Sequence, residues 1–360
     1  MSFHSTQWHF YTRTDETWKA LKEAFINARK TIDIEEYILE RDAVGQEFLE
    51  LLIKKRQEGV RVRILCDMAG SYGFFASSLP ETLQDIGIEV KFFNIIKPWR
   101  IHSFFSWFFR DHRKLIIVDG NVGFVGGVNI RKDMRSWRDT HVRVTGPITK
   151  EMQNAFHEMW FVANERKFCG RIAKTKNFVK GFQFITNSPN IGKRYLYQEL
   201  IQAIRGAKNY IYLTTPYFVP DRRMRRVLRL AAKRGVEVKI LVPKTSNYPL
   251  VDSGSHAYYD KLISSGIRIF QYYGELLHAK TAVIDDTWAT IGSFNLDSLS
   301  FLYNFEANIV STNALFAKEI REYFENDMTS SQEVSLSEWR KRSTTMKIKE
   351  FITLPIRRFL

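Results

Sequence analysis

Two stretches of the chain carry the same reactive residues at the same spacing. The first contains His112, Lys114, Asp119, Gly126 and Asn129, and the second contains His278, Lys280, Asp285, Gly292 and Asn295. Imidazole can attack phosphorus or move a proton, while ammonium and amide groups can bind phosphate oxygens. Because both copies keep every gap, we expect them to serve one site that acts on a phosphodiester.

Each copy taken alone has an ordinary structural explanation. A histidine and a lysine two residues apart often lie on a solvated strand edge, and Asp119-Gly120 is a common turn. The repetition favours the catalytic interpretation. The other histidines lie in no such frame, and we expect surface or satisfied polar roles for them: His4, His9, His102, His141, His157 and His256.

Paired strands must position the two motifs. Residues 114–118 and 281–284 are apolar, β-rich runs, so the sequence predicts a strand in each. Residues i and i+2 of a strand face the same side, so each histidine projects beside its lysine. Turns after these strands lead into returning strands. The small pairs Gly126-Gly127 and Gly292-Ser293 would let the backbone approach a ligand closely.

The two halves of the chain resemble each other beyond these motifs. Residues 28–37 resemble 207–216, and residues 59–65 match 235–241. Each half alternates helical and extended patterns, which predicts an α/β layer architecture. We therefore expect two similar α/β/α domains related by a pseudo-twofold axis, with the active site at their interface. The expected divisions are 1–170, 171–335 and a basic amphipathic tail at 336–360.

Composition limits the class of protein and of partner. The chain has 360 residues, 44% of them hydrophobic, which supports two cored domains and excludes wholesale disorder. Its two cysteines, Cys66 and Cys169, form no disulfide framework or paired-cysteine metal motif, so a reducing compartment is expected. A net charge of +15 predicts an anionic partner, either nucleic acid or an acidic lipid surface. Without an apolar run of about 18 residues or a signal-peptide pattern, we expect a soluble protein or one that binds a membrane from one side.

Two segments have the composition of membrane-contacting surfaces. Residues 99–110 place six aromatic side chains beside two arginines, and aromatic rings favour the boundary between headgroups and acyl chains. Residues 339–360 interleave seven Lys/Arg and one Glu with apolar residues, a pattern typical of helices that lie on acidic membranes. The alternative for both is a helix packed on its own domain. The expected contact residues are Trp99, Phe104, Phe105, Trp107, Phe108, Phe109, Trp339, Arg340, Lys341 and Arg342.

The motifs and their neighbours resemble the phospholipase D superfamily, and within it the bacterial cardiolipin synthases. The resemblance covers residues 15–330, and its motifs are highly specific. The strings that carry it are DHRK (111–114), FVGGVN (124–129), WRDTH (137–141), TTPYFVPD (214–221), LHAK (277–280), GSFNLD (292–297) and NFE (304–306). The chain is similar to the shorter members, which lack the two N-terminal membrane helices of many such synthases. The resemblance implies phosphatidyl transfer without metal or cofactor, in which two phosphatidylglycerol molecules give cardiolipin and glycerol through a phosphatidyl-histidine intermediate.

The resemblance also implies roles for individual residues. It favours His112 as the nucleophile and His278 as the acid and base, a choice that the symmetry of the sequence does not make. Asp139 and Glu306 would orient the two histidines, each carboxylate serving the opposite half. We expect Asp119 and Asp285, although part of the catalytic motif, to brace the turns. The expected ligands of the phosphate oxygens are Lys114, Lys280, Asn129, Asn295 and Ser293.

Three other functions share parts of this pattern. The first is another lipid enzyme of the superfamily, a hydrolase or a transferase that uses an alcohol or phosphatidylethanolamine. The second is a nuclease, which the basic charge would suit, and the third is a non-catalytic lipid-binding scaffold. The aromatic segment and the basic tail favour a lipid substrate over nucleic acid. We therefore expect a peripheral protein on the cytoplasmic face, with an anionic phospholipid membrane as its partner; the sequence sets neither the second lipid nor the oligomeric state.

Overall fold

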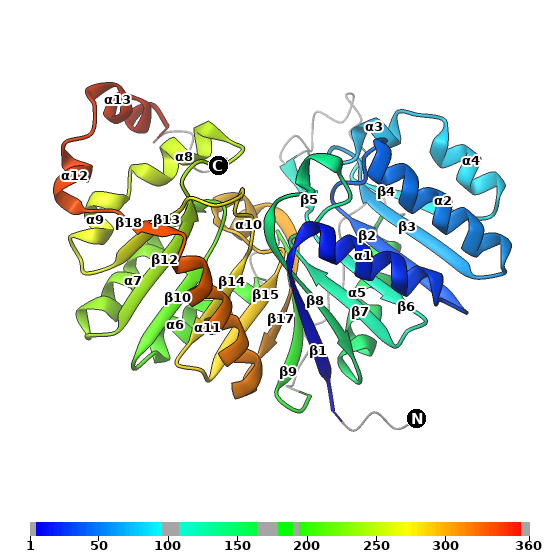
Figure 1. Cartoon of the computed structure of the whole chain (residues 1–360), viewed down its shortest axis with the longest axis horizontal. Coiled ribbons are helices and arrows are strands. Elements are labelled where there is room, and N and C mark those ends of the chain that lie inside the picture. The colour runs from blue at the N-terminus through cyan, green and yellow to red at the C-terminus, as the bar shows by residue number, and fades with distance from the viewer. Residues whose placement is uncertain (1–4, 96–107, 164–178, 190–193, 354–360) are drawn as a thin grey trace.

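Two α/β units lie side by side in the computed structural model, which describes residues 5–95, 108–163, 179–189 and 194–353. Each unit has a central β-sheet with helices packed on it (Figure 1). The expected boundary near residue 170 falls within 164–178, outside the described residues.

The first unit contains a seven-stranded sheet in the order β1-β8-β7-β6-β2-β3-β4. Strands β2, β3 and β4 are parallel, whereas β6 runs antiparallel to β2 and continues through β7, β8 and β1 as an antiparallel meander. The strands are β1 (Gln7–Arg13), β2 (Thr31–Glu36), β3 (Arg61–Asp67), β4 (Glu89–Phe93), β6 (Leu115–Val118), β7 (Val122–Gly126) and β8 (Arg138–Thr145).

The second unit repeats this arrangement. Strands β10, β12, β14, β15 and β17 have the same neighbours and directions as β2, β3, β6, β7 and β8. The strands are β9 (Phe182–Asn187), β10 (Tyr210–Thr214), β12 (Glu237–Pro243), β13 (Arg268–Tyr272), β14 (Thr281–Ile284), β15 (Trp288–Gly292), β17 (Asn304–Ser311) and β18 (Ser331–Glu333). A separate pair joins β11 (Phe218–Val219) to β16 (Leu296–Asp297). The two predicted domains of similar α/β fold are therefore confirmed.

The helices bury apolar stripes against these sheets, as their spacing predicts. Trp18, Leu21 and Phe25 are the buried face of α1, and Met224, Val227 and Leu228 are that of α7. The helices of the first unit are α1 (Thr14–Ile26), α2 (Ala43–Gln57), α3 (Tyr72–Phe75), α4 (Leu79–Asp85) and α5 (Ile148–Val162), with a 3-10 turn, η2, at Lys132–Met134. Those that follow are α6 (Tyr195–Gly206), α7 (Arg222–Lys233), α8 (Pro249–His256), α9 (Tyr259–Ile263), α10 (Ser298–Leu302), α11 (Ala314–Met328), α12 (Leu336–Arg340) and α13 (Thr344–Thr353).

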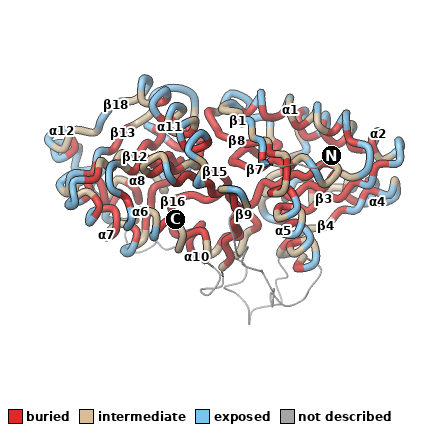
Figure 2. The backbone as a smooth tube through the Cα atoms, turned by 90° about the horizontal axis from the view of Figure 1, so that it is seen from below, coloured by how far each residue is buried: buried red, intermediate tan, exposed pale blue. Residues whose placement is uncertain are grey.

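Strands join the two units at their junction. Strand β5 (Arg110–Asp111) belongs to the first unit in sequence but pairs in parallel with β17 of the second. In the reverse direction, Arg138 at the start of β8 forms a bridge with Leu277. A hydrophobic cluster that includes Phe93 and Phe305 crosses the same junction, and Figure 2 shows buried backbone on both sides of it. The two units thus share one continuous core at the place where the motifs lie.

Candidate active site

Each catalytic motif lies on a β-hairpin next to the junction. His112 and Lys114 precede β6, Asp119 forms the β6–β7 turn, and Asn129 follows β7. The second copy has the same positions on the β14–β15 hairpin. Strand β6 therefore separates His112 from Asp119, so these two members of the motif lie at opposite ends of one strand.

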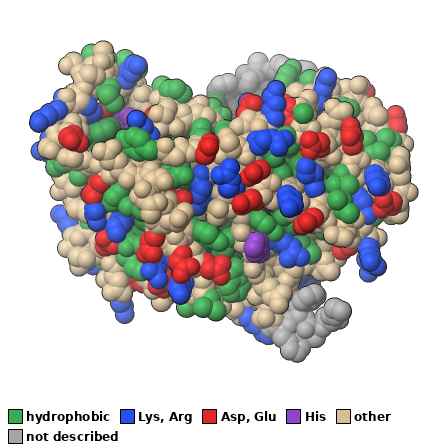
Figure 3. All heavy atoms as spheres, viewed as in Figure 1, with side chains coloured by type: hydrophobic (Ala, Val, Ile, Leu, Met, Phe, Trp, Pro, Cys, Tyr) green, Lys and Arg blue, Asp and Glu red, His purple; other side chains and the backbone are tan. Residues whose placement is uncertain are grey.

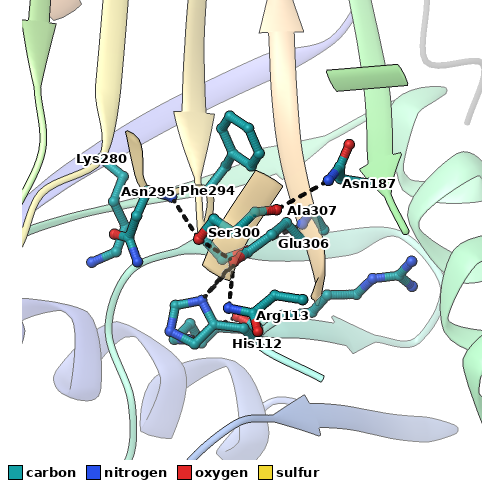
Figure 4. A network of polar contacts seen from close by, with 12 residues as sticks. His112, Arg113, Asn187, Lys280, Phe294, Asn295, Ser300, Glu306 and Ala307 are labelled. Carbon is teal, nitrogen blue, oxygen red and sulfur yellow. Dashed lines mark hydrogen bonds and ion pairs between the residues drawn. The ribbon is translucent and has the colours of Figure 1, made fainter. Parts of the chain in front are cut away.

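Each histidine contacts a carboxylate from the other unit. Nδ1 of His112 lies 3.0 and 3.1 Å from the two carboxylate oxygens of Glu306, as Figure 4 shows, and Nδ1 of His278 lies 2.6 Å from Oδ2 of Asp139. The backbone repeats the exchange, because His112 donates its N–H to the carbonyl of Phe305 and His278 to that of Arg138. A carboxylate at Nδ1 holds the proton there, so Nε2 is the nitrogen whose lone pair can react.

Both histidines line one cavity of about 640 Å³. Residues from both units form its wall, so a single ligand can meet both imidazoles. Aromatic rings also lie against them: Tyr37 is 4.8 Å from the ring of His112, and Trp137 is 5.1 Å from that of His278. The remaining wall is mixed polar and apolar, and includes Ile38, Asn129, Tyr217, Asn247, Leu250, Val251, Asn295, Asp297 and Asn304.

The two motif lysines are buried cations close to the histidines. Nζ of Lys114 donates to the carbonyl of His112 at 2.8 Å, and Nζ of Lys280 donates to the carbonyl of His278 and lies 2.9 Å from its Nδ1. Burial lowers the pKa of Lys114 to about 8 and that of Lys280 to about 7. A bound phosphodiester anion would restore a counter-charge to both ammonium groups.

Burial and the lysines also act on the histidines. Burial lowers the pKa of His112, and Glu306 opposes this shift. The pKa of His278 falls further, to about 4, because the Lys280 ammonium adds to the effect of burial. For Asp139, burial acts to raise the pKa, but Lys280 and His278 outweigh it and hold the pKa below the usual value. In the unliganded protein both imidazoles are therefore biased towards the neutral form.

The predicted phosphate ligands divide into two groups. Asn129 and Asn295 line the cavity, where the amide N–H groups of their side chains could donate to a phosphate oxygen. Ser293 differs from the prediction. Its hydroxyl donates to Glu306 and accepts the backbone N–H of Ala307 at 3.1 Å, so it holds the carboxylate rather than facing the cavity.

The small residues of the motif make room for a strand and not for a ligand. A Cβ atom on Gly126 would lie 2.5 Å from the carbonyl oxygen of Thr140, and one on Gly292 would lie 2.2 Å from that of Ala307. On Gly127 it would lie 2.2 Å from Oδ1 of Asp139. The expectation of a close backbone–ligand approach is therefore corrected: the absent side chains let β8 and β17 bring the orienting carboxylates to the histidines.

The motif aspartates brace the turns at the far ends of the hairpins. Asp119 accepts the backbone N–H groups of Arg29, Lys30 and Thr31 at 2.7–3.2 Å. Asp285 accepts those of residues 208, 209 and 210 at 2.7–2.9 Å. Both have positive φ, 52° and 54°, which aspartate tolerates in turns. This geometry supports a bracing role for both.

The expected membrane residues have different surroundings. Trp99, Phe104, Phe105 and Trp107 lie outside the described residues. Phe108 lines the cavity, and the ring of Phe109 lies 6.5 Å from that of Tyr303.

In the tail, the prediction that Trp339 contacts a membrane was wrong. Its side chain is buried against His256 and Tyr259 in the core of the second unit. Arg340 pairs with Asp260 and Arg342 with Glu350, while Lys341 is exposed. The start of the tail is therefore docked on its own domain, which was the alternative considered for it.

Two residues that hold Glu306 were not among the predicted site residues, although Asn304 lies in one of the strings that carry the family resemblance. Ser300 donates to Glu306 at 2.7 Å (Figure 4). Asn304 donates to the same oxygen at 3.2 Å. Asn304 stands two residues before Glu306 on one strand, so alternation could have placed it on the same face. Ser300 belongs to the short helix α10, and nothing in its neighbourhood indicates that it faces a carboxylate.

Comparison with known proteins agrees with this geometry. A model of the family described as "Cardiolipin synthase, PLD-like domain" matches residues 21–160 and 200–328. The chain belongs to this family. Cardiolipin synthase A of Pseudomonas fluorescens (strain SBW25) is 34% identical over 342 residues, which cover 92% of this chain and 71% of that protein. Cardiolipin synthase 1 of Bacillus anthracis is 32% identical over 360 residues, with 94% and 70% covered.

Two solved structures share the fold of this chain. Phosphatidylserine synthase of Haemophilus influenzae Rd KW20 superposes with a TM-score of 0.75 at 15% identity, covering 98% of this chain and 95% of that one. Polyphosphate kinase of Porphyromonas gingivalis superposes with a TM-score of 0.64 at 15% identity, covering 92% of this chain and 49% of that one. Within the described residues, no cluster of three metal-ligating side chains occurs, and none of the helices there has the length and apolar character needed to cross a bilayer.

Proposed function

We propose that this chain is a phosphatidyltransferase that joins two phosphatidylglycerol molecules into cardiolipin and releases glycerol. The observation that carries the proposal is one cavity lined by two imidazoles, each held at Nδ1 by a carboxylate from the opposite unit. Membership of the cardiolipin synthase family supplies the substrate class. The mostly apolar wall of the cavity suits a lipid better than a nucleic acid.

The first step would transfer the phosphatidyl group to the protein. Nε2 of His112 attacks phosphorus, and the bond from phosphorus to the headgroup glycerol oxygen breaks. His278, in its protonated form, gives its Nε2 proton to that oxygen, and glycerol leaves. The products of this step are a phosphatidyl-histidine at His112 and a neutral His278.

The second step reverses the roles of the same groups. His278 takes the proton from a headgroup hydroxyl of a second phosphatidylglycerol, and the resulting oxygen attacks phosphorus. The phosphorus–nitrogen bond breaks, which frees His112 and releases cardiolipin. His278 is again protonated and ready for another first step.

Cationic and amide side chains would stabilise the negative charge on the phosphate oxygens in the transition state. Lys114 and Lys280, with Asn129 and Asn295, would bind the non-bridging oxygens as negative charge develops on them. We propose that Glu306 and Asp139 stabilise the imidazolium and phosphoimidazolium forms, because each accepts from Nδ1. Ser293 would act through Glu306, as a positioning residue.

The assignment of the nucleophile rests on family resemblance. In the unliganded protein the lower pKa belongs to His278, about 4, which would suit a nucleophile better than an acid. That value reflects the neighbouring Lys280 ammonium as well as burial, and a bound phosphate anion offsets this cation and raises the pKa. We therefore keep His112 as nucleophile and His278 as acid and base.

The membrane is the proposed partner, since both substrates reside in it. We propose peripheral attachment, with the cytoplasmic face as the working assignment. Purified protein incubated with phosphatidylglycerol vesicles and excess chelator should yield cardiolipin and glycerol, resolved by mass spectrometry. Phosphatidic acid as the main product would identify a hydrolase, and a product that requires added phosphatidylethanolamine would identify a different second lipid. Cleavage of an oligonucleotide without lipid turnover would identify a nuclease.

A further inference from the structure

Large apolar side chains are exposed along one edge of the molecule. On α13, Phe351, Ile352 and Ile348 are 73%, 61% and 52% exposed. Tyr248, which immediately precedes α8, and Leu250 on that helix are 53% and 50% exposed. Figure 1 places α13 and α8 at the top of the second unit, and Figure 3 shows a notch between the two lobes on the same side. Large apolar side chains that are exposed on two neighbouring helices indicate a surface that binds a partner.

Helix α13 is turned with its polar side inward. Glu350 and Thr353 are its buried residues, and Glu350 accepts two hydrogen bonds of 2.7 Å from the guanidinium of Arg342. This pairing fixes the rotation of the helix, so Phe351 and Ile352 must point outward. Folding of the domain alone would favour the opposite rotation, with the apolar residues buried. Among the described residues, none covers the outward apolar face of α13.

Part of the exposed apolar set belongs to the wall of the cavity. Tyr248 and Leu250 belong to both, because each lines the cavity and is half exposed. Helix α8, which carries Leu250, packs against α13. Exposed apolar side chains therefore lie both at the wall of the cavity and on the neighbouring helix α13.

We propose that this surface, formed by Tyr248, Leu250, Ile348, Phe351 and Ile352, docks on a bilayer that contains anionic lipid. The inference rests on the proposed function, because a lipid substrate must pass from a bilayer into the cavity without crossing water. Exposed Lys347 and Lys349 lie on α13 beside the apolar residues, and the chain carries a net charge of +15. Apolar residues flanked by lysine suit the boundary between headgroups and acyl chains, and each lysine there attracts anionic headgroups.

The geometry favours a bilayer over a second copy of the chain. A dimer formed through this surface would cover Tyr248 and Leu250, and with them the approach to the cavity. A bilayer instead brings substrate to that approach. Docking through α13 and α8 would hold the cavity at the depth of the headgroups, where the phosphodiester to be cleaved is found.

The test is co-sedimentation of the full chain with vesicles of equal parts phosphatidylcholine and phosphatidylglycerol, compared with phosphatidylcholine alone. The double variant Phe351→Glu/Ile352→Glu places two carboxylates on the docking surface. We expect its partition onto the mixed vesicles to fall by about tenfold or more, from loss of apolar burial and repulsion from anionic lipid. The matched control is Phe161→Glu, which alters an equally exposed residue (65%) on α5 and should bind as the unaltered chain does.

A second measurement separates docking from catalysis. Turnover of a short-chain phosphatidylglycerol, dispersed below its micelle concentration, should be the same in the double variant and the unaltered chain. Unchanged vesicle binding by the double variant would overturn the proposal, and so would parallel loss of vesicle binding and dispersed-substrate turnover. Conversion of a dimer to a monomer by the variant, with vesicle binding intact, would show that a second copy occupies the surface and would also overturn it. Vesicle binding through this surface without any cardiolipin formation would refute the proposed function and leave the docking surface standing.

Discussion

The two half-sites carry the same reacting groups in different surroundings. The strand beside Lys114 contributes Glu35 and Glu36, which are buried, and His112 stands between Asp111 and Arg113, which are also buried. In the second half-site the equivalent positions hold uncharged residues, also buried: Thr214, Thr215, Leu277 and Ala279. The strand register confirms the match, because Glu35 pairs with the residue after Lys114 and Thr214 with the residue after Lys280.

This difference changes the electrostatics more than the geometry. Nη1 of Arg113 lies 3.5 Å from Oε1 of Glu35, and burial raises the pKa of Glu35 and that of Asp111, the latter to about 7. Burial lowers the pKa of Lys114, and nearby carboxylates, among them Glu306 and Glu36, oppose that shift. Duplication has thus preserved the positions of the reacting atoms while their buried surroundings diverged. The two imidazoles of one cavity therefore differ in pKa, and the lower value belongs to His278 in the unliganded protein.

The orienting carboxylates show a second difference. Asp139 approaches the position of Gly127, where a Cβ would clash with it, whereas the equivalent residue Ser293 donates its hydroxyl to Glu306. Glu306 also accepts from Ser300 and Asn304. The longer carboxylate thus has three side-chain donors besides the histidine, while Asp139 accepts a backbone N–H from Thr140 at 2.7 Å.

The largest expected effect is the loss of cardiolipin formation when either histidine is replaced, and an activated substrate should then distinguish the two roles. His112→Ala and His278→Ala should each lower cardiolipin formation by about 10⁴-fold or more, because each removes a group that no neighbour replaces. Phosphatidyl-p-nitrophenol needs no acid for its leaving group, so His278→Ala should still release one equivalent of nitrophenol per site and then stop. His112→Ala should release none, and exposed His9→Ala should turn over normally. A burst from His112→Ala and none from His278→Ala would reverse the assigned roles.

The carboxylates should follow the histidine of the opposite unit. Glu306→Gln should suppress the nitrophenol burst, because it acts on His112, while Asp139→Asn should keep the burst and lose the second step. Each variant should lower cardiolipin formation by about 10²-fold or more. Circular dichroism of both variants checks that the fold is retained. Equal suppression of the burst by both substitutions would contradict the cross-unit pairing of roles.

The buried ionic cluster should affect stability more than chemistry. Arg113→Ala leaves Glu35 without its buried partner and should lower the free energy of unfolding by about 3 kcal/mol or more. Glu35→Thr/Arg113→Ala gives these two positions the composition of the second half-site and should recover most of that loss. Denaturant unfolding of the two variants measures the difference. A double variant that is as unstable as Arg113→Ala would show that the cluster contributes net stability.

The smallest expected effect is a shift in pH dependence. With pKa values of about 7 and 8, Lys280 and Lys114 are cationic at lower pH and lose their protons as pH rises through those values. We therefore expect kcat/KM for dispersed short-chain phosphatidylglycerol to fall above pH 7, since the free enzyme then loses cations that bind phosphate. Lys280→Arg should remove the lower of the two transitions and Lys114→Arg the higher, because arginine stays charged. An unchanged profile in both variants would assign the fall to another group.

Much of this site could be predicted from the sequence, because the reactive residues have the spacing of a β-strand and occur in two matching copies. The spacing of His112 and Lys114 on a strand places both on one face, and the exact repeat at His278 indicates a shared site. Asp139 and Glu306 follow from family resemblance, and their matched placement after each motif agrees with it. The sequence does not show which neighbour the side chain of a motif residue will contact. Ser293 could face a ligand or a carboxylate, and only the approach of β17 decides between them.

The tail shows the same gap between pattern and packing. Its alternation of basic and apolar residues correctly indicates an amphipathic helix, but not which face turns inward. Trp339 is buried among aromatic rings of the second unit, although its basic neighbours suggested an interfacial residue. The rotation of α13 depends on one buried ion pair between Arg342 and Glu350, a long-range choice that periodicity does not contain.

Every imidazole–carboxylate pair in this site straddles the seam between the two units. In each pair, one unit supplies the histidine and the other supplies the carboxylate. The backbone hydrogen bonds from His112 to Phe305 and from His278 to Arg138 also join the two units. A motion that separated the two units would therefore remove the carboxylate partners of both histidines together. We therefore expect activity to depend on how closely the two units pack against each other.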